Sequence, residues 1–281
     1  MAQLLDGKLL SEQLLEEIRK RTDILKARGV DPGLAVIFVG EDPASRVYVN
    51  NKEKACERTG IRSFMVQLPE NTTQEELESR IRAFNEDPEV HGILVQLPLP
   101  GHLNERHALS LIDPKKDVDG FHIQNAGKLF SGEEGTLPCT PRGVIYMLKK
   151  MGVPMAGREA VVVGRSNIVG KPTAMLLLRE NCTVTLCHSR TENLKAHTLR
   201  ADILVVAVGK PGFITADMVK EGAAVVDVGI NRVNGRVVGD VDTENVARKA
   251  AYISPVPGGV GKMTVSMLLL NTVEAAERTL S

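Results

Sequence analysis

A short stretch in the second half of the chain constrains the fold more strongly than any other part of the sequence. Residues 160–163 are apolar and favour a strand, and Gly164 ends this run. A second glycine, Gly170, precedes the apolar run at residues 174–178, which is typical of a helix. A buried parallel strand, a tight turn and a helix start thus follow one another. Such a turn directs backbone N–H groups toward one point, where a phosphate binds well.

The glycine spacing in this turn leaves two interpretations open. Gly164, Ser166 and Gly170 form the pattern G-x-S-x-x-x-G, which differs from the G-x-G-x-x-G pattern of many dinucleotide-binding folds. Turns between a strand and a helix also carry glycines for purely steric reasons. The pattern alone is compatible with dinucleotide binding and with close backbone packing.

Composition narrows the class of protein. The chain has 281 residues, enough for one large or two ordinary domains. Lysine plus arginine and aspartate plus glutamate number 35 each, so the net charge is zero, which argues against a general nucleic-acid or anionic-membrane surface. No apolar run approaches membrane-spanning length, and residues 1–11 lack the apolar core of a signal peptide. We therefore expect a cytoplasmic protein.

The four cysteines form no recognisable motif. Cys56, Cys139, Cys182 and Cys187 include no C-x-x-C pair, and His188 has no second ligand at a suitable spacing. We therefore expect reduced cysteines packed as small apolar groups, and no bound metal.

Strand and helix patterns alternate along the first hundred residues. Apolar runs at residues 34–39, 61–68 and 92–97 predict strands. The segments between them predict helices, one at residues 45–59 and one opened by a Thr-x-x-Glu capping box at Thr73.

The flanking segments predict two more helices and a connection. Ser11 is a good N-cap, and Gly29 a good stop, for a helix before the first strand. Residues 113–135 are rich in charge and glycine and predict a long surface connection. Thr140 is a good N-cap for a helix with Pro141 at its first position.

The second half of the chain repeats the alternation. Residues 183–187, 203–208 and 223–228 predict strands, and the Asn-Gly pair at residues 234–235 predicts a hairpin turn. Residues rich in proline and glycine at 254–261 then predict a shaped loop.

The whole pattern predicts an α/β fold with two lobes and parallel sheets. Residues 1–138 form the first lobe, joined by the end of a closing helix that spans residues 263–279. That returning segment is residues 265–281, and residues 139–264 form a Rossmann-like second lobe. We expect the active site in the cleft between the lobes, because ligand sites favour domain interfaces.

The strand that ends at Cys187 favours NADP over NAD. Folds that bind NAD place an Asp or Glu there, about 20 residues after the first glycine, to bind the ribose 2′-hydroxyl. This chain has Ser189 and Arg190 instead, and Arg165 lies in the glycine turn. A hydroxyl and guanidinium groups suit the 2′-phosphate of NADP. The alternative is that both arginines are solvated surface charges.

Five polar residues in the first half are candidates for chemistry. Tyr48 and Lys52 lie four apart on one helix face, and a lysine is an acid–base group when its pKa is lowered. Gln96 lies at a strand end, where α/β sheets bind ligands. Asp117 and Asp119 can pair with an amino-bearing ligand. The alternatives are a solvated lysine beside a half-buried tyrosine, and a simple Asp-Gly turn.

Six motifs that carry these residues resemble, in their order, the bifunctional methylenetetrahydrofolate dehydrogenase/cyclohydrolase family. They span nearly the whole chain, and together they are far more specific than any one alone. The motifs are Tyr48-x-x-x-Lys52, Val95-Gln96-Leu97-Pro98-Leu99-Pro100, Lys116-Asp117-Val118-Asp119-Gly120, Pro138-Cys139-Thr140-Pro141, Val163-Gly164-Arg165-Ser166-x-Ile168-Val169-Gly170 and Pro255-Val256-Pro257-Gly258-Gly259-Val260-Gly261.

The resemblance implies two successive reactions on tetrahydrofolate derivatives. Methylenetetrahydrofolate transfers a hydride to NADP, and water then opens the resulting methenyltetrahydrofolate to 10-formyltetrahydrofolate. The family pattern makes Lys52 the general acid and base of the hydrolysis, positioned and tuned by Gln96. It places Tyr48 against the folate rings and Asp119 on the amino-pyrimidine edge of the pterin.

The resemblance also implies binding residues and an assembly. Ser45 lines the folate site, and a loop with Pro257, Gly258 and Gly259 closes over folate. The first lobe is then the catalytic and folate-binding domain, the second binds NADP, and a homodimer is expected. The residues predicted to contact NADP are Thr140, Gly164, Arg165, Ser166, Ser189, Arg190 and Ile230.

One position departs from the family pattern. Members commonly carry proline after the last loop glycine, where this chain has Lys262. The change releases the fixed φ of proline, so the rigidity of the loop is in question. In the alternative interpretation, Lys262 binds a phosphate or the glutamate tail of folate.

Three rival functions are weighed against the bifunctional enzyme. They are a dehydrogenase without hydrolysis, an NADP-dependent dehydrogenase for another small carbonyl or amino acid, and a non-catalytic NADP sensor. The presence of Lys52, Gln96 and Asp119 together favours the bifunctional enzyme. No G-x-x-x-x-G-K-[ST] loop is present, so the sequence does not predict an ATP-dependent synthetase.

Overall fold

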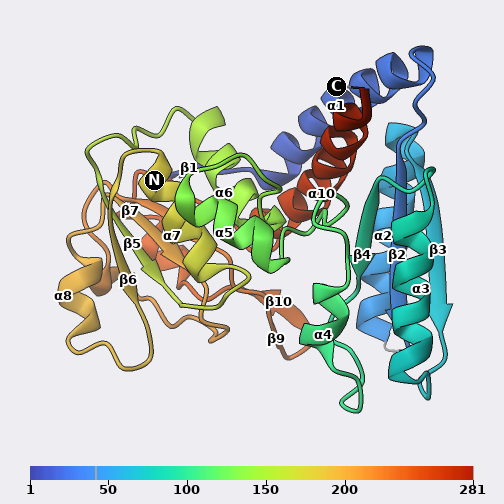
Figure 1. Cartoon of the computed structure of the whole chain (residues 1–281). Coiled ribbons are helices and arrows are strands. Elements are labelled where there is room, and N and C mark those ends of the chain that lie inside the picture. Colours follow the sequence, from blue (N-terminus) through green and yellow to red (C-terminus); the bar gives the residue numbers. More distant parts are fainter. Residues whose placement is uncertain (42, 281) are drawn as a thin grey trace. The chain divides into compact units, whose positions relative to one another are not determined.

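The structure, a computed structural model, describes residues 1–41 and 43–280, without the side chains of residues 43–45, 47 and 48. The chain divides into two compact units. Unit 1 consists of Met1–Glu12 and Thr140–Thr264, and unit 2 of Gln13–Cys139 and Val265–Ser281. Both units combine helices with a parallel sheet, so the predicted α/β class is confirmed (Figure 1).

Unit 2 is built on a three-stranded parallel sheet. The strand order is β3-β2-β4, and all seven residues of the central strand β2 are buried. The crossovers from β2 to β3 and from β3 to β4 run in opposite directions across the sheet. Since such crossovers are right-handed, α2 and α3 must cover opposite faces, as Figure 1 shows. Helix α3 buries Leu77, Ile81 and Phe84, which share one face at helical spacing.

The chain passes between the units within α1, between Cys139 and Thr140, and within α10, and the remaining elements of unit 2 lie between the first two passages. The elements are α1 (Gly7–Ala27), β2 (Gly33–Val39), α2 (Pro43–Thr59), β3 (Arg62–Leu68), α3 (Gln74–Glu86), β4 (Gly92–Val95), α4 (Glu105–Ser110), α5 (Ile123–Ser131) and α10 (Val260–Glu277).

Unit 1 is built on a six-stranded parallel sheet of order β1-β11-β8-β7-β5-β6. Strand β6 lies on one side of β5 and β7 on the other, so the chain reverses its direction across the sheet between β5 and β7. In open α/β sheets the ligand crevice opens at this reversal, at the carboxyl ends of the strands.

A separate two-stranded hairpin completes unit 1, with its turn at the predicted Asn-Gly pair. The elements of unit 1 are β1 (Gln3–Leu4), α6 (Cys139–Lys150), β5 (Glu159–Val163), α7 (Gly170–Arg179), β6 (Thr183–Cys187), α8 (Leu194–Thr198), β7 (Ile203–Val206), β8 (Ala224–Asp227), β9 (Asn231–Val233), β10 (Arg236–Val238), α9 (Thr243–Val246) and β11 (Tyr252–Ile253). Short 3-10 helices lie at Ala216–Met218 and, at the end of the chain, Arg278–Leu280.

The first twelve residues belong to a different unit from the one that the sequence predicted. The sequence interpretation placed residues 1–138 in one lobe, whereas Met1–Glu12 belong to unit 1. The reason is strand β1, in which Gln3 and Leu4 pair in parallel with β11 at the edge of the six-stranded sheet. The sequence interpretation missed both strands, because two residues are too few to show a period.

The structure corrects several predicted elements. Ser11 does not begin α1, which starts at Gly7, because Asp6 already accepts a hydrogen bond from the N–H of Leu9 (3.0 Å). The connection predicted at residues 113–135 contains the helix α5, whose N-cap is His122. The closing helix α10 begins at Val260, inside the segment predicted to be loop.

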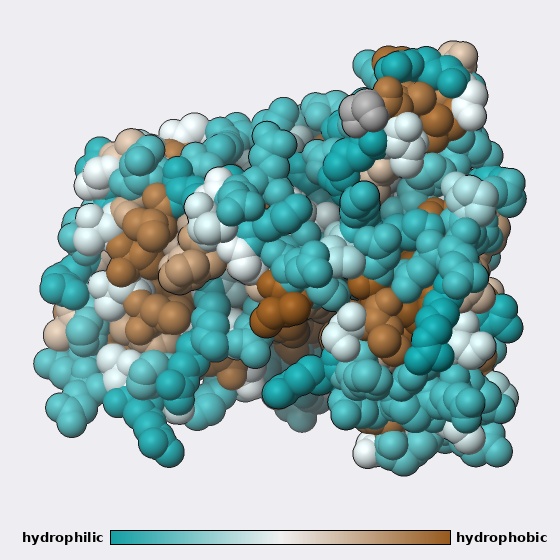
Figure 2. Space-filling view, viewed as in Figure 1, coloured by the Kyte–Doolittle hydropathy of each residue, from teal (hydrophilic) through white to brown (hydrophobic). Residues whose placement is uncertain are grey.

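The visible surface is predominantly polar. Figure 2 shows a mostly hydrophilic face on which the apolar side chains form several separate areas rather than one continuous band. Among the helices of residues 1–41 and 43–280, none combines the length and the apolar character needed to cross a membrane.

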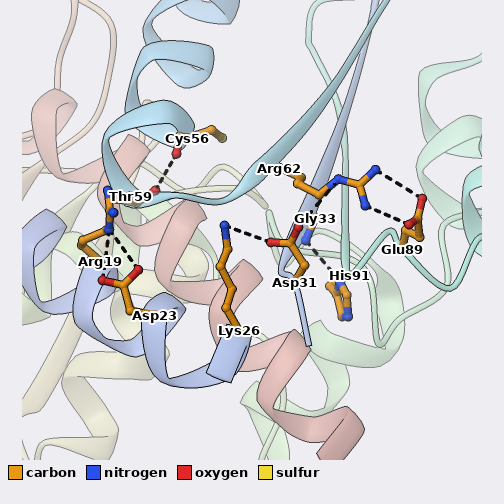
Figure 3. Close-up of polar contacts among 10 residues, drawn as sticks. All are labelled: Arg19, Asp23, Lys26, Asp31, Gly33, Cys56, Thr59, Arg62, Glu89 and His91. Carbon is orange, nitrogen blue, oxygen red and sulfur yellow. Dashed lines mark hydrogen bonds and ion pairs between the residues drawn. The ribbon is translucent and has the colours of Figure 1, made fainter. Parts of the chain in front are cut away.

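A polar cluster lies at the amino ends of the strands in unit 2 (Figure 3). Asp31 pairs with Lys26 (3.2 Å), and Glu89 pairs with Arg62 (2.8 Å). These side chains are exposed, so the pairs contribute little to stability. His91 in the same cluster is buried, and its Nδ1 accepts a hydrogen bond from the N–H of Gly33 (3.1 Å).

The pKa of His91 is lowered from its ordinary value of 6.5, first by burial and then by the charge of Lys116. Because the neutral ring is favoured in the folded state, its contribution to the free energy of unfolding is present above pH 6.5. This contribution is lost as the pH falls from 6.5 toward the lowered pKa.

We expect His91→Leu to lower the free energy of unfolding by roughly 1–3 kcal/mol at pH 8, because the buried N–H of Gly33 loses its acceptor. The difference in stability between wild type and variant should shrink as the pH is lowered below 6.5. Urea unfolding of both proteins between pH 5 and about 8 measures this difference. A difference that is the same at every pH would contradict the assignment.

Candidate active site

Lys52 and Gln96 form a direct hydrogen-bonded pair in unit 2. Lys52 lies on α2, is 9% exposed, and donates from Nζ to Oε1 of Gln96 at 2.6 Å. Gln96 follows directly after β4, and its backbone N–H donates to the carbonyl of Ile37 on β2 (2.8 Å). Its side-chain Nε2 donates to the carbonyl of Leu97 (2.7 Å). This second contact fixes the orientation of the amide, so its oxygen faces the lysine.

Burial lowers the pKa of Lys52 and raises the pKa of Asp119, so it favours the neutral form of each side chain. The pKa of Lys52 is lowered by burial, against the attraction of the Asp119 carboxylate. The pKa of Asp119 is raised to about 6, mainly by burial and further by Asp117, while Lys52 and a hydrogen bond with Cys139 oppose the rise. A lysine brought closer to neutrality can take up and release protons at working pH.

Asp117 organises the loop that carries Asp119. Its carboxylate is 2% exposed and accepts from the backbone N–H groups of Gly120 (3.1 Å), Phe121 (3.2 Å) and His122 (2.9 Å). These contacts occupy Asp117, so of the two candidate carboxylates only Asp119 is left for a ligand.

Gly120 is required in the same loop. Its φ is +74°, and a Cβ there would lie 2.6 Å from the backbone nitrogen of Pro138. The spacing Asp-x-Asp-Gly therefore has a steric reason as well as a chemical one.

Asn271, on α10, supports the same loop from a distant part of the chain. Its side-chain Nδ2 donates to the carbonyls of Val118 (2.7 Å) and Leu137 (2.9 Å). The thiol of Cys139 also donates to the carbonyl of Val118 (3.2 Å). The residue before Asp119 is thus held from two directions. The sequence interpretation missed Asn271, since nothing near it in the chain marks it.

Two predicted folate residues lie outside what the structure describes. The side chains of Tyr48 and Ser45 are among those not described, although both residues belong to α2. The structure therefore brings together Lys52, Gln96 and Asp119 from the predicted catalytic set.

The glycine turn of unit 1 has the backbone geometry of a cofactor cradle. Gly164 has a φ of +124°, and a Cβ there would overlap the carbonyl oxygen of Ala207. A Cβ on Gly170 would lie 2.5 Å from the carbonyl carbon of Gly164. Both glycines are therefore needed because the backbone packs closely on itself here, which gives the turn the tight shape found in dinucleotide-binding folds.

Ser166 changes the expected role of this turn. Its hydroxyl oxygen accepts from the N–H groups of Val169 (3.2 Å) and Gly170 (3.3 Å), and its carbonyl accepts from Lys171 (3.0 Å). The sequence interpretation expected these first N–H groups of α7 to be free for a phosphate. They are occupied by Ser166, whose hydroxyl hydrogen remains a donor for a ligand.

The acid-free end of β6 lies at the same edge of the sheet as the glycine turn. Val163 of β5 pairs with Cys187 of β6, and the N–H of Gly164 donates to the carbonyl of Cys187 (2.9 Å). Ser189 and Arg190 follow after His188 and are exposed, as is Arg165. The residues present at this edge therefore fit the 2′-phosphate of NADP.

The loop that precedes α10 is docked on the start of α1 within unit 1. The N–H of Lys8 donates to the carbonyl of Gly258 (2.9 Å), and Gly7 lies so close to Gly259 that any side chain there would overlap it. Pro257 follows a cis peptide bond. Ile230, which is 52% exposed, lies beside Gly261.

Lys262 and Thr140 have identifiable contacts in unit 1. The N–H of Lys262 donates to the carbonyl of Gly259 (3.1 Å), a bond that the proline of the family pattern does not make. Thr140 lies inside α6, which begins one residue earlier than its predicted N-cap position. Its hydroxyl pairs with that of Thr264 (3.0 Å).

The described part of the chain holds no group of three or more His, Cys, Asp or Glu side chains that could bind a metal ion. The four cysteines are buried, and no disulfide joins them in the described part of the chain.

Comparison with known proteins identifies the family. The model for the tetrahydrofolate dehydrogenase/cyclohydrolase catalytic domain matches residues 5–119, and the model for the NAD(P)-binding domain of the same family matches residues 138–280. The "Bifunctional protein FolD" of Bacillus subtilis is 55% identical over 281 residues, covering 100% of this chain and 99% of that protein. The protein of the same name from Acetivibrio thermocellus is 58% identical over 277 residues, covering 98% and 97%.

Solved structures agree over the full length. The FolD methylenetetrahydrofolate dehydrogenase/cyclohydrolase of Campylobacter jejuni is 51% identical, with a TM-score of 0.98, covering 99% of this chain and 100% of that one. The Trypanosoma brucei dehydrogenase-cyclohydrolase, solved with NADP and an inhibitor, is 41% identical, with a TM-score of 0.94, covering 99% and 98%. This chain therefore belongs to the tetrahydrofolate dehydrogenase/cyclohydrolase family.

Proposed function

We propose that this protein oxidises 5,10-methylenetetrahydrofolate to 5,10-methenyltetrahydrofolate with NADP, and then hydrolyses the product to 10-formyltetrahydrofolate. The observation that carries the proposal is the buried Lys52, which is hydrogen-bonded to Gln96 at 2.6 Å and electrostatically coupled to Asp119. A dehydrogenase alone has no use for such a group, because hydride transfer needs orientation rather than an acid or base. Family membership supplies the substrate class.

The hydrolytic step needs a proton acceptor, and Lys52 is proposed for this role. Water adds to the methenyl carbon, the bond from that carbon to N5 breaks, and one proton is released overall. The neutral amine of Lys52 takes this proton from the attacking water, which its lowered pKa favours. Gln96 holds the amine in place, and the carboxylate of Asp119 stabilises the ammonium that forms.

Folate binding is proposed for the remaining catalytic-domain residues. Asp119 also binds the amino-pyrimidine edge of the pterin, where a carboxylate meets two N–H donors. Tyr48 and Ser45 contact the folate ring system, and the loop of Pro257, Gly258 and Gly259 closes over it, as the family pattern implies.

NADP, when bound, accepts the hydride that the folate carbon loses. The proposed contacts are those predicted from the sequence, and the acid-free edge beside Gly164 supports them. Arg165 and Arg190 neutralise the 2′-phosphate, and the hydroxyls of Ser166 and Ser189 donate to phosphate oxygens. Thr140 and Ile230 bound the rest of the cofactor site.

We also propose a cytoplasmic location and a homodimer. The four cysteines are buried and form no disulfide among the described residues, which supports a reducing compartment. The homodimer rests on the family resemblance.

Two absorbance assays test the proposed function. With methylenetetrahydrofolate and NADP, the purified protein should form NADPH in proportion to the folate consumed. With methenyltetrahydrofolate alone, it should accelerate the loss of the methenyl absorbance. Oxidation without hydrolysis would indicate a simple dehydrogenase, and absence of both would refute the proposal.

We expect Lys52→Met to lower methenyltetrahydrofolate hydrolysis by a factor of roughly 100 or more, because the step loses its proton acceptor. NADP binding should stay close to that of wild type, since Lys52 takes no part in the proposed cofactor contacts. Lys54→Met is the matched control, because Lys54 is exposed on the same helix. Hydrolysis at the wild-type rate in Lys52→Met would exclude the assigned role.

We expect Arg165→Ala to raise the KM for NADP by a factor of roughly 10 to 100, because a charge-assisted contact with phosphate is lost. The KM for NAD should change far less, so the preference for NADP should narrow. The ratio of kcat/KM for the two cofactors measures the effect. Arg179→Ala, at the exposed far end of α7, is the matched control. A ratio equal to that of wild type would refute the role of Arg165.

A further inference from the structure

We propose that Asp240 is a positioning residue for the cofactor site. Its carboxylate holds the loop at residues 208–210 in the shape that NADP binding requires, without touching NADP itself. The inference rests on the proposed use of NADP and extends it to a residue outside the family motifs found in the sequence.

The carboxylate of Asp240 is fully buried and takes up four donors. Oδ2 accepts from the N–H groups of Val208 (2.6 Å) and Gly209 (2.9 Å). Oδ1 accepts from the N–H of Lys210 (2.8 Å) and from Nδ2 of Asn231 (2.9 Å). Three consecutive backbone N–H groups thus converge on one side chain that lies 30 residues further along the chain.

The loop held in this way lies at the place where the sheet binds ligands. It follows β7, whose neighbour in the sheet is β5, and the chain reverses direction between these two strands. The N–H of Ala207 donates to the carbonyl of Val163 (2.8 Å), and Gly164 packs directly on the carbonyl of Ala207. The loop therefore begins against the glycine turn, on the opposite side of β5 from Ser189 and Arg190.

A second buried carboxylate anchors Asp240. Asp227, the last residue of β8, accepts from the N–H groups of Asp240 (3.0 Å), Val241 (2.9 Å) and Gly229 (2.9 Å). Burial raises the pKa of Asp227 to about 6 against these three donors, and the charge of Asp240 adds to the rise. The two carboxylates are therefore close enough to repel each other, and the backbone donors compensate.

The same arrangement places Ile230, a proposed cofactor contact. Gly229 lies so close to the carboxyl group of Asp240 that a Cβ would overlap it, and Ile230 is the next residue. Asn231, the residue after Ile230, donates to Asp240 directly. Asp240 therefore bounds the cofactor site from two sides, through residues 208–210 and through Ile230.

The N–H groups of residues 208–210 are occupied by Asp240, so the loop contributes its shape to the cofactor site rather than donors for a phosphate. Converging N–H groups form a site for an anion, and here the chain supplies that anion. A phosphate of the cofactor cannot use these N–H groups while Asp240 occupies them. Loss of the carboxylate leaves three donors without an acceptor, so the loop must change its shape.

Asp240→Asn tests the proposal, because it keeps the size of the side chain and turns one acceptor oxygen into an NH₂ donor. We expect the dissociation constant for NADP, measured by calorimetry without folate, to rise at least about tenfold, with a matching rise in the KM for NADP. Hydrolysis of methenyltetrahydrofolate without NADP should stay within about twofold of wild type. Hydrolysis depends on Lys52, so its rate should not respond to a change that is confined to the cofactor site.

Asp242→Asn is the matched control. Asp242 is two residues away and caps the short helix α9 through Asn245, so the variant makes the same change in charge without touching residues 208–210. NADP binding by this control should equal that of wild type.

The possible results separate the positioning role from a general structural role. NADP affinity within about twofold of wild type in Asp240→Asn would overturn the proposal, and so would an equal fall in NADP binding and in hydrolysis. If Asp240→Asn does not fold, Asn231→Ala tests the proposal instead. This variant removes one hydrogen-bond donor to the carboxylate of Asp240 and leaves the three backbone donors in place. NADP affinity unchanged in that variant would also overturn the proposal. Wild-type protein that binds NADP but oxidises no methylenetetrahydrofolate would refute the proposed function alone.

Discussion

Parallel strand pairing is the constraint on which both units depend. Every strand pair in the two main sheets is parallel, and among the described residues only the β9–β10 hairpin is antiparallel. Parallel pairing brings the carboxyl ends of the strands to one edge of each sheet. Gln96 follows β4 at such an edge in unit 2, and Gly164 and Asp227 mark the same kind of edge in unit 1. Residues far apart in sequence therefore become neighbours without any local signal.

Buried charges in this fold are compensated in two different ways. Asp117 and Asp240 each take up three backbone N–H groups of a loop, so their charges are compensated by the chain itself. Lys52 has Gln96 as its hydrogen-bond partner, and the pKa values of Lys52 and Asp119 are shifted toward neutrality. Lys52 and Asp119 thus have the kind of shifted pKa values that suits proton transfer.

Local signals in the sequence predicted the local structure well. The alternation of strands and helices, the capping box at Thr73 and the turn at Asn234 are confirmed. Each of these depends on residues within a few positions of one another. The pairing of β1 with β11 joins residues about 250 positions apart, and the contacts of Asn271 reach back to Val118 across 153 positions. A single sequence carries no record of such contacts, so the strand pairing, the placement of residues 1–12 and the supporting side chains needed the structure.

The structure also shifts how phosphate recognition in the cofactor site must be explained. The first N–H groups of α7 are taken by Ser166, and those after β7 are taken by Asp240. A helix start and a glycine turn normally provide such groups to an anion. Because the chain uses them internally here, attraction for the phosphates has to come from side chains at the same edge. Arg165 and Arg190, both exposed, are the residues proposed to supply this charge, whereas the carboxylates of Asp227 and Asp240 are buried behind backbone donors.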